Sequence, residues 1–166
     1  MSVFDELAHA IEVYERPPLD GHVRTTRERF ERFFASHEPL CRTVIAAGID
    51  ARRAGVARAR IAADTERVKE IIDQLWGGLW DGLSYIGYDE GYFYGGQPWS
   101  ELCVVRSAVE LLEELYDLRD PEMGSEARGI MDTFAHEMFQ PLEVPDGMPE
   151  SHWWWRAAHP PSAPTD

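Results

Sequence analysis

The chain has 166 residues, of which 44 % are apolar, and a formal net charge of −14. This length and composition are typical of one globular domain and exclude a wholly disordered chain. The charge is uneven, because residues 1–70 hold twelve basic and twelve acidic residues whereas residues 71–166 hold four and eighteen. Such an acidic half repels phosphate backbones, so we expect no binding to duplex nucleic acid and favour a basic partner.

Membrane and secreted classes are also disfavoured. No apolar run approaches the roughly 18 residues that a membrane-spanning helix needs, and the N-terminus lacks the basic-then-apolar order of a signal peptide. Cys41 and Cys103 are too few for a disulfide framework, and their redox state stays open. We therefore expect a cytoplasmic protein that does not enter membranes.

Apolar residues in the N-terminal third recur at helical spacing. A first helix is expected to begin after Ser2, whose side chain caps it, and to end before Pro17. Two shorter helices are expected over residues 23–35 and 36–48. Gly48 is expected to close the second of these in a left-handed conformation.

Longer helices are expected after this point. A helix that opens at Asp50 carries an apolar stripe as far as Leu79, and two adjacent glycines should weaken its end. Another major helix begins near residue 98 or 100 and ends before Pro121. A last helix is expected over residues 125–139.

These elements predict an all-α fold. Residues 1–139 should form an irregular single-domain helical bundle of about five to six helices, and residues 140–166 a Pro- and Trp-rich extended C-terminal tail. The tail holds Trp153, Trp154 and Trp155. Three adjacent tryptophans in water would expose much apolar area, so at least one should dock on the molecule or on a partner.

The most informative segment covers residues 76–99, which hold eight of the nineteen aromatic residues and seven of the thirteen glycines. Glycine permits close backbone approach, and aromatic side chains anchor many interfaces. These aromatics either pack the open end of the bundle or form a surface for a partner or a cationic ligand. Together with the tail, the candidate binding residues are Trp76, Trp80, Tyr85, Tyr88, Tyr92, Tyr94, Trp99, Trp153, Trp154 and Trp155.

Catalytic motifs are scarce. The sequence has no glycine-rich phosphate loop, no nucleophile elbow and no histidine spacing typical of zinc sites. Two pairs have helical spacing that would let them share a cation, Glu6 with His9 and Asp132 with His136, and both are expected to face solvent. We therefore predict no metal and no cofactor, and regard an enzyme as the less favoured class.

The sequence thus predicts a small acidic helical protein-interaction module that binds another protein through aromatic residues. Inhibitor, immunity-type and assembly-subunit roles all fit, and the oligomeric state stays open. The alternative is a helical-bundle enzyme with a carboxylate and histidine metal site or an aromatic small-molecule pocket.

Overall fold

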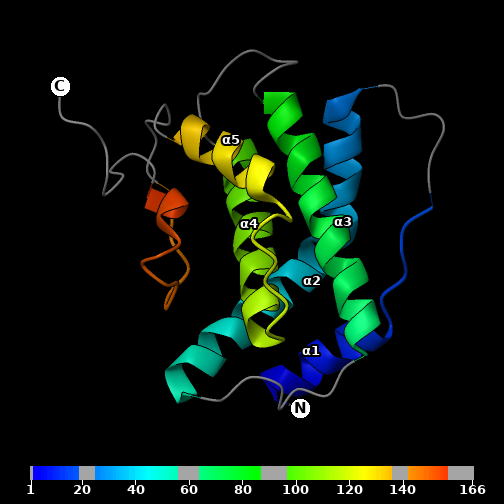
Figure 1. Ribbon diagram of the computed structural model, residues 1–166, viewed down its shortest axis with the longest axis vertical. Helices are drawn as coiled ribbons and strands as arrows, with labels where there is room; N and C mark the ends of the chain where they lie inside the picture. The colour runs from blue at the N-terminus through cyan, green and yellow to red at the C-terminus, as the bar shows by residue number, and fades with distance from the viewer. Residues whose placement is uncertain (1, 19–24, 56–63, 87–96, 136–141, 157–166) are drawn as a thin grey trace.

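The computed structural model describes residues 2–18, 25–55, 64–86, 97–135 and 142–156, and within them it is all-helical, which confirms the predicted fold class (Figure 1). The described residues form one helical domain with five α-helices and a 3-10 turn near the C-terminal end. In chain order the elements are α1 (Val3–Glu12), α2 (Thr26–Ala54), α3 (Thr65–Ser84), α4 (Gln97–Leu115), α5 (Ser125–Ala135) and η2 (Trp153–Arg156).

Helix α2 is the centre of the bundle, because it packs against α1, α3 and α4. Helix α3 also packs on α4 and on the shorter α5, while α1 lies across the lower end (Figure 1). The apolar faces of these helices meet in one core, which holds large side chains such as Phe30, Leu79 and Trp99. No helix among the described residues is long and apolar enough to cross a membrane.

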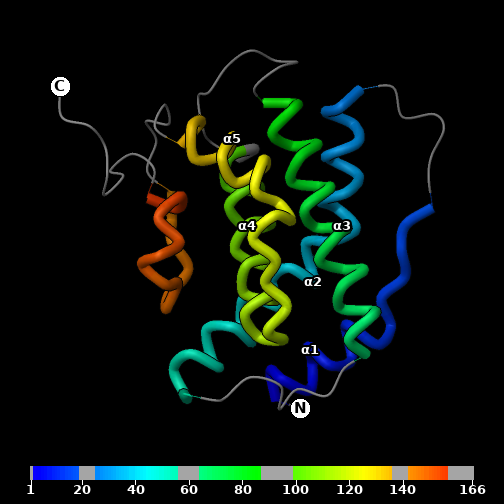
Figure 2. Tube along the Cα trace, in the orientation of Figure 1, coloured from blue at the N-terminus to red at the C-terminus, as the bar shows by residue number. Residues whose placement is uncertain are grey.

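The prediction of two short helices over 23–35 and 36–48 is wrong, because α2 is continuous through Pro39. Proline removes one backbone hydrogen bond, and α2 changes direction about halfway along its length (Figure 2). Gly48 is not a cap but lies inside α2, where an added Cβ would come within 3.0 Å of Leu111 in α4. The left-handed cap is Gly55, with φ at 61°.

Helix α3 begins later than predicted, after its N-cap Asp64 rather than at Asp50. It also continues past the two adjacent glycines to Ser84. An ideal Cβ on Gly78 would meet the Phe33 ring at 2.1 Å, so this glycine lets α2 pack closely on α3. Tertiary packing therefore offsets the weak helix propensity of glycine here.

Helix α1 begins as predicted, because the side chain of Ser2 accepts a hydrogen bond from the backbone N–H of Asp5. It ends at Glu12, before the predicted stop at Pro17. Helix α5 ends at Ala135 within the described residues, and positions 136–139 of the predicted helix lie outside them.

Within residues 142–156 the C-terminal segment docks on the helical domain, which is one of the two positions expected for its tryptophans. Trp154 and Trp155 are buried in the main core. The indole N–H of Trp99 donates to the Trp154 carbonyl at 3.3 Å, which joins this segment to α4. Docking removes the large apolar area of two indoles from water, so the hydrophobic effect favours the docked position of this short segment.

Candidate functional site

Five of the seven predicted aromatic binding residues that the structure describes serve the core. The buried ones are Trp76, Tyr85, Trp99, Trp154 and Trp155, while Trp153 is half-buried. Trp80 differs, because 37 % of its surface is exposed. Tyr88, Tyr92 and Tyr94 lie outside the described residues. The five buried side chains pack in the core of the chain itself.

An open groove of about 1380 Å³ runs beside α3 and reaches the exposed Trp80. One wall is α2 over residues 29–37, and the other is α3 over residues 73–81 together with residues 122–127 at the start of α5. Residues 16–18 also line the groove. The groove thus gathers four stretches that are far apart in sequence, and we call it the α3 groove.

Two aromatic side chains and two glycines form the inner surface of the α3 groove. Phe33 packs over Gly78, and Trp76 packs over Gly124, whose φ of +76° and close ring contact both suit glycine. The Trp76 indole N–H donates to the carboxylate of Glu113 at 3.4 Å. This ring is therefore held in place from both sides rather than free to swing into solvent.

Large exposed apolar side chains are concentrated at this groove. Among the described residues the exposed large hydrophobics are Val13, Trp80 and Met123, and the last two line the α3 groove. Adjacent exposed apolar side chains beside a concave surface are typical of interaction sites, whereas an isolated one is ordinary. Val13, at the end of α1, is such an isolated residue and provides a control.

Gly77 also lines the α3 groove, and unlike Gly78 it is exposed with nothing within 4 Å of an added Cβ. Neither packing nor positive φ accounts for a glycine at this position of the helix. Its structural consequence is a patch of bare helix backbone that another chain can approach closely.

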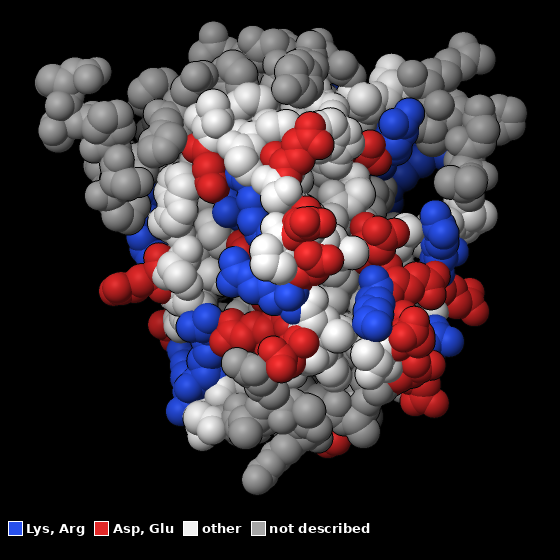
Figure 3. Space-filling view, viewed as in Figure 1, with Lys and Arg blue, Asp and Glu red and all other residues white. Residues whose placement is uncertain are grey.

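Basic side chains lie on one wall of the groove rim and acidic side chains on the other. Arg29 and Arg32 lie on the α2 wall, while Asp73 and Asp81 lie on α3 and Glu122 and Glu126 beside them before and within α5. Acidic and basic side chains alternate on the face that carries α3 and α5 (Figure 3). Arg29 pairs with Asp81 at 3.5 Å, and burial raises the pKa of Asp81 although Arg29 opposes that shift.

His37 lies at the base of the α2 wall and was missed by the sequence analysis. Its Nε2 is 2.8 Å from the Tyr14 hydroxyl, and its Nδ1 is 2.9 Å from the Phe33 carbonyl. A carbonyl only accepts, so Nδ1 carries the proton and the Tyr14 hydroxyl donates to Nε2. Burial lowers the pKa of His37 and raises that of Tyr14 to about 12, so the pair stays neutral and ties residue 14 to α2.

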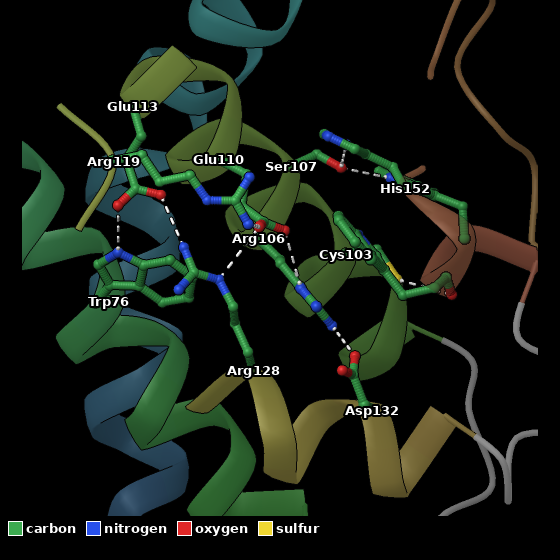
Figure 4. Close-up of polar contacts among 12 residues, drawn as sticks. Trp76, Cys103, Arg106, Ser107, Glu110, Glu113, Arg119, Arg128, Asp132 and His152 are labelled. Atoms are coloured by element: carbon green, nitrogen blue, oxygen red, sulfur yellow. Dashed lines mark hydrogen bonds and ion pairs between the residues drawn. The ribbon is translucent and has the colours of Figure 1, made fainter. Parts of the chain in front are cut away.

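A buried ion-pair network lies directly behind Trp76 (Figure 4). The Arg128 guanidinium stacks 4.4 Å from the Trp76 ring centre and donates to Glu113 at 2.9 Å. Arg128 also pairs with Glu110 at 3.2 Å, and Glu110 pairs with Arg106 at the same distance. Burial raises the pKa of Glu113, and the neighbouring Arg128 opposes that shift.

The candidate metal pairs do not assemble a site within the described residues. The carboxylate of Asp132 accepts a 2.6 Å bond from Arg106, which neutralises it, and His136 lies outside the described part of the chain. Glu6 and His9 are exposed on α1. Across the described ranges, no group of three or more His, Cys, Asp and Glu side chains is placed to hold a metal ion.

Behind Arg106, polar contacts fix the C-terminal segment to α4. Arg106 stacks 3.9 Å from the Trp154 ring centre. Ser107 Oγ lies 2.8 Å from His152 Nδ1 and accepts from the Trp155 indole N–H at 2.7 Å. Burial, with the nearby Arg52 and Arg106 charges, lowers the pKa of His152 to about 4. The neutral histidine is thus a structural part of the docked segment.

The two cysteines are buried thiols. Burial raises the pKa of Cys41 to about 12 and that of Cys103 well above its ordinary value. The Cys103 thiol points at the Trp154 carbonyl, 3.6 Å away. Neither thiol is therefore activated as a nucleophile, since that requires an accessible thiolate.

No family model, no curated protein and no solved structure matches this chain.

Proposed function

We propose that the protein is an interaction module that binds another protein in the α3 groove. The observation that carries this proposal is the position of Trp80 and Met123, each 37 % exposed, on the wall formed by α3 and residues 122–127 of a concave surface that the Phe33 and Trp76 rings also line. Exposed anchors beside a well-packed hollow are the usual core of a protein interface.

Size and charge argue against other ligands. Small-molecule pockets usually enclose about 300–1000 Å³, whereas this groove is open and larger, at about 1380 Å³. The net charge of −14 disfavours nucleic acid and favours a basic partner. The C-terminal tryptophans contribute less to this proposal than the groove does, because Trp154 and Trp155 are buried within the chain.

Site-specific photocrosslinking in the native host tests the proposal. A photoreactive amino acid replaces Met123 on the groove in one strain and Val13 on α1 in a matched strain, since both side chains are exposed and apolar. Adducts are purified through a tag on the chain and identified by mass spectrometry.

The expected result is one defined polypeptide joined at position 123 and absent at position 13. The adduct should be lost when Trp80→Ala is added, because that substitution removes an exposed anchor without opening the core. Equal adducts at both positions, or none at position 123, would contradict the proposed function.

A further inference from the structure

We propose that the segment held by the α3 groove is an amphipathic helix of another protein, with Arg or Lys along the edge that faces α3 and α5. This inference rests on the proposed function and specifies its partner. Three features of the groove support this inference: the nature of its walls, the bare backbone at Gly77, and carboxylates that form no ion pair with a described residue.

The walls favour a helix over an extended segment. Both long walls are α-helices, whose backbone N–H and C=O groups are bonded within α2 and α3 apart from the one α2 carbonyl that Pro39 leaves without an intrahelical donor. An extended segment lying between them would lose water from its own backbone groups without gaining partners. A helix carries its backbone hydrogen bonds with it, so it can enter such a groove at no such cost.

The length and depth of the groove also suit a helix. The lining stretch of α3, residues 73–81, rises about 12 Å at 1.5 Å per residue, which is roughly two helical turns. A partner helix lying along it would present apolar residues at positions i, i+3 or i+4, and i+7 to Trp80, Met123 and Phe33. Gly77, midway along α3, lets the two backbones approach closely.

The charges around the groove indicate which edge of the partner helix is basic. Asp73, Glu122 and Glu126 are exposed on one side of the groove, and none of them forms an ion pair with a described residue. On the opposite wall, Arg29 is already paired with Asp81, and Arg32 makes a contact of its own. Arg16 also lines the groove, is exposed and forms no ion pair with a described residue, so three carboxylates along the edge formed by α3 and the start of α5 stand against one guanidinium and the unbalanced charge is acidic.

A partner with basic side chains on that edge complements three carboxylates at once. Exposed ion pairs are each worth a factor of about two in affinity, so three together are worth about tenfold at low salt, mostly through faster association. The opposite edge of the helix, which faces Arg29 and Arg32, is expected to be neutral or acidic.

The test reads the partner sequence where it crosslinks to position 123 and then measures the complex with purified proteins. The crosslinked segment should have apolar residues at helical spacing with Arg or Lys beside them. Proline placed at a central, outward-facing position of that segment should abolish binding, whereas alanine there should not. If the bound segment is extended, both the proline and the alanine substitution should leave binding intact.

A charge-matched pair of variants tests the edge. The groove variant Asp73→Asn, Glu122→Gln, Glu126→Gln should slow association about tenfold at low salt. The control variant Asp50→Asn, Glu143→Gln, Glu150→Gln removes the same three charges at exposed positions away from the groove and should change the rate by less than about twofold.

The outcomes separate the two levels of the proposal. Absence of any adduct at position 123 overturns the proposed function and this inference with it. An adduct with an acidic segment, with an extended segment that tolerates proline, or with a second copy of this chain overturns the inference alone. Equal effects of the two charge variants would also overturn it, because the groove would then not sense the partner's basic edge.

Discussion

Two glycines of α3 should respond in opposite directions to the same substitution. For Gly77→Ala, the new Cβ meets nothing within 4 Å, so the change should stabilise the fold by about 1 kcal/mol through helix propensity alone. For Gly82→Ala, the Cβ would lie 2.4 Å from a Leu102 methyl and 2.7 Å from the Phe30 ring. Both of those side chains are fully buried, so overpacking should cost about 1–3 kcal/mol.

After the same propensity gain, Gly82→Ala should destabilise the protein by up to about 2 kcal/mol, so the two variants should differ by about 1–3 kcal/mol. Urea unfolding followed by circular dichroism measures this difference at constant slope. In thermal unfolding, the midpoint should rise by about 3 °C for the first variant and fall by a similar amount for the second. Equal shifts of the same sign would refute the packing of α2 and α4 on α3 that we describe.

Three further predictions concern the buried polar contacts and the C-terminal segment. Because the pKa of His152 is lowered to about 4, the unfolded chain takes up a proton first as the pH falls, so up to about 3 kcal/mol of stability should be lost between pH 6.5 and 4. In urea titrations, His152→Gln should remove this loss. If the free energy of unfolding depends on pH in the same way in this variant and in the wild type, His152 is not buried as described. Trp154→Ala should cost about 3–5 kcal/mol in the same assay and Trp153→Ala clearly less, since only the former is buried; equal costs would argue against the docked segment. Arg128→Ala should cost about 3–5 kcal/mol because it strands the Glu113 carboxylate, which is 1 % exposed, and adding Glu113→Gln should recover part of that loss; strict additivity in this double-mutant cycle would mean that the two side chains do not interact.

Local signals in the sequence were sufficient for the fold class and several helix ends. The start of α1 follows from Ser2 and Asp5, which cap each other and are only three residues apart in sequence. The path of α2 did not follow from local signals. The penalty of Pro39 is local, whereas the apolar face that keeps α2 continuous is stabilised by α1, α3 and α4, which come from elsewhere in the chain.

The candidate site depended even more on distant contacts. Trp76 and Trp80 are four residues apart on α3 and look equivalent in sequence. Trp76 is buried because Gly124 and Arg128 cover it, while Trp80 remains exposed. The glycines at 77 and 78 likewise differ only through the Phe33 ring, which α2 brings to one of them. Composition identified the aromatic segment, but only the packing separates its core residues from its groove residues.

The most direct test of the central claim fills the α3 groove and leaves the fold intact. Gly77→Leu adds a side chain at the groove whose Cβ meets nothing within 4 Å, and Gly129→Leu adds one with an equally open Cβ at an exposed position of α5, away from the groove. Native mass spectrometry at low salt then compares the protein isolated from its own host in the three forms. We expect the wild type and Gly129→Leu to carry the same bound polypeptide and Gly77→Leu to lose it while it stays folded. Retention of that polypeptide by Gly77→Leu, or a wild-type chain that carries no polypeptide, would contradict the account.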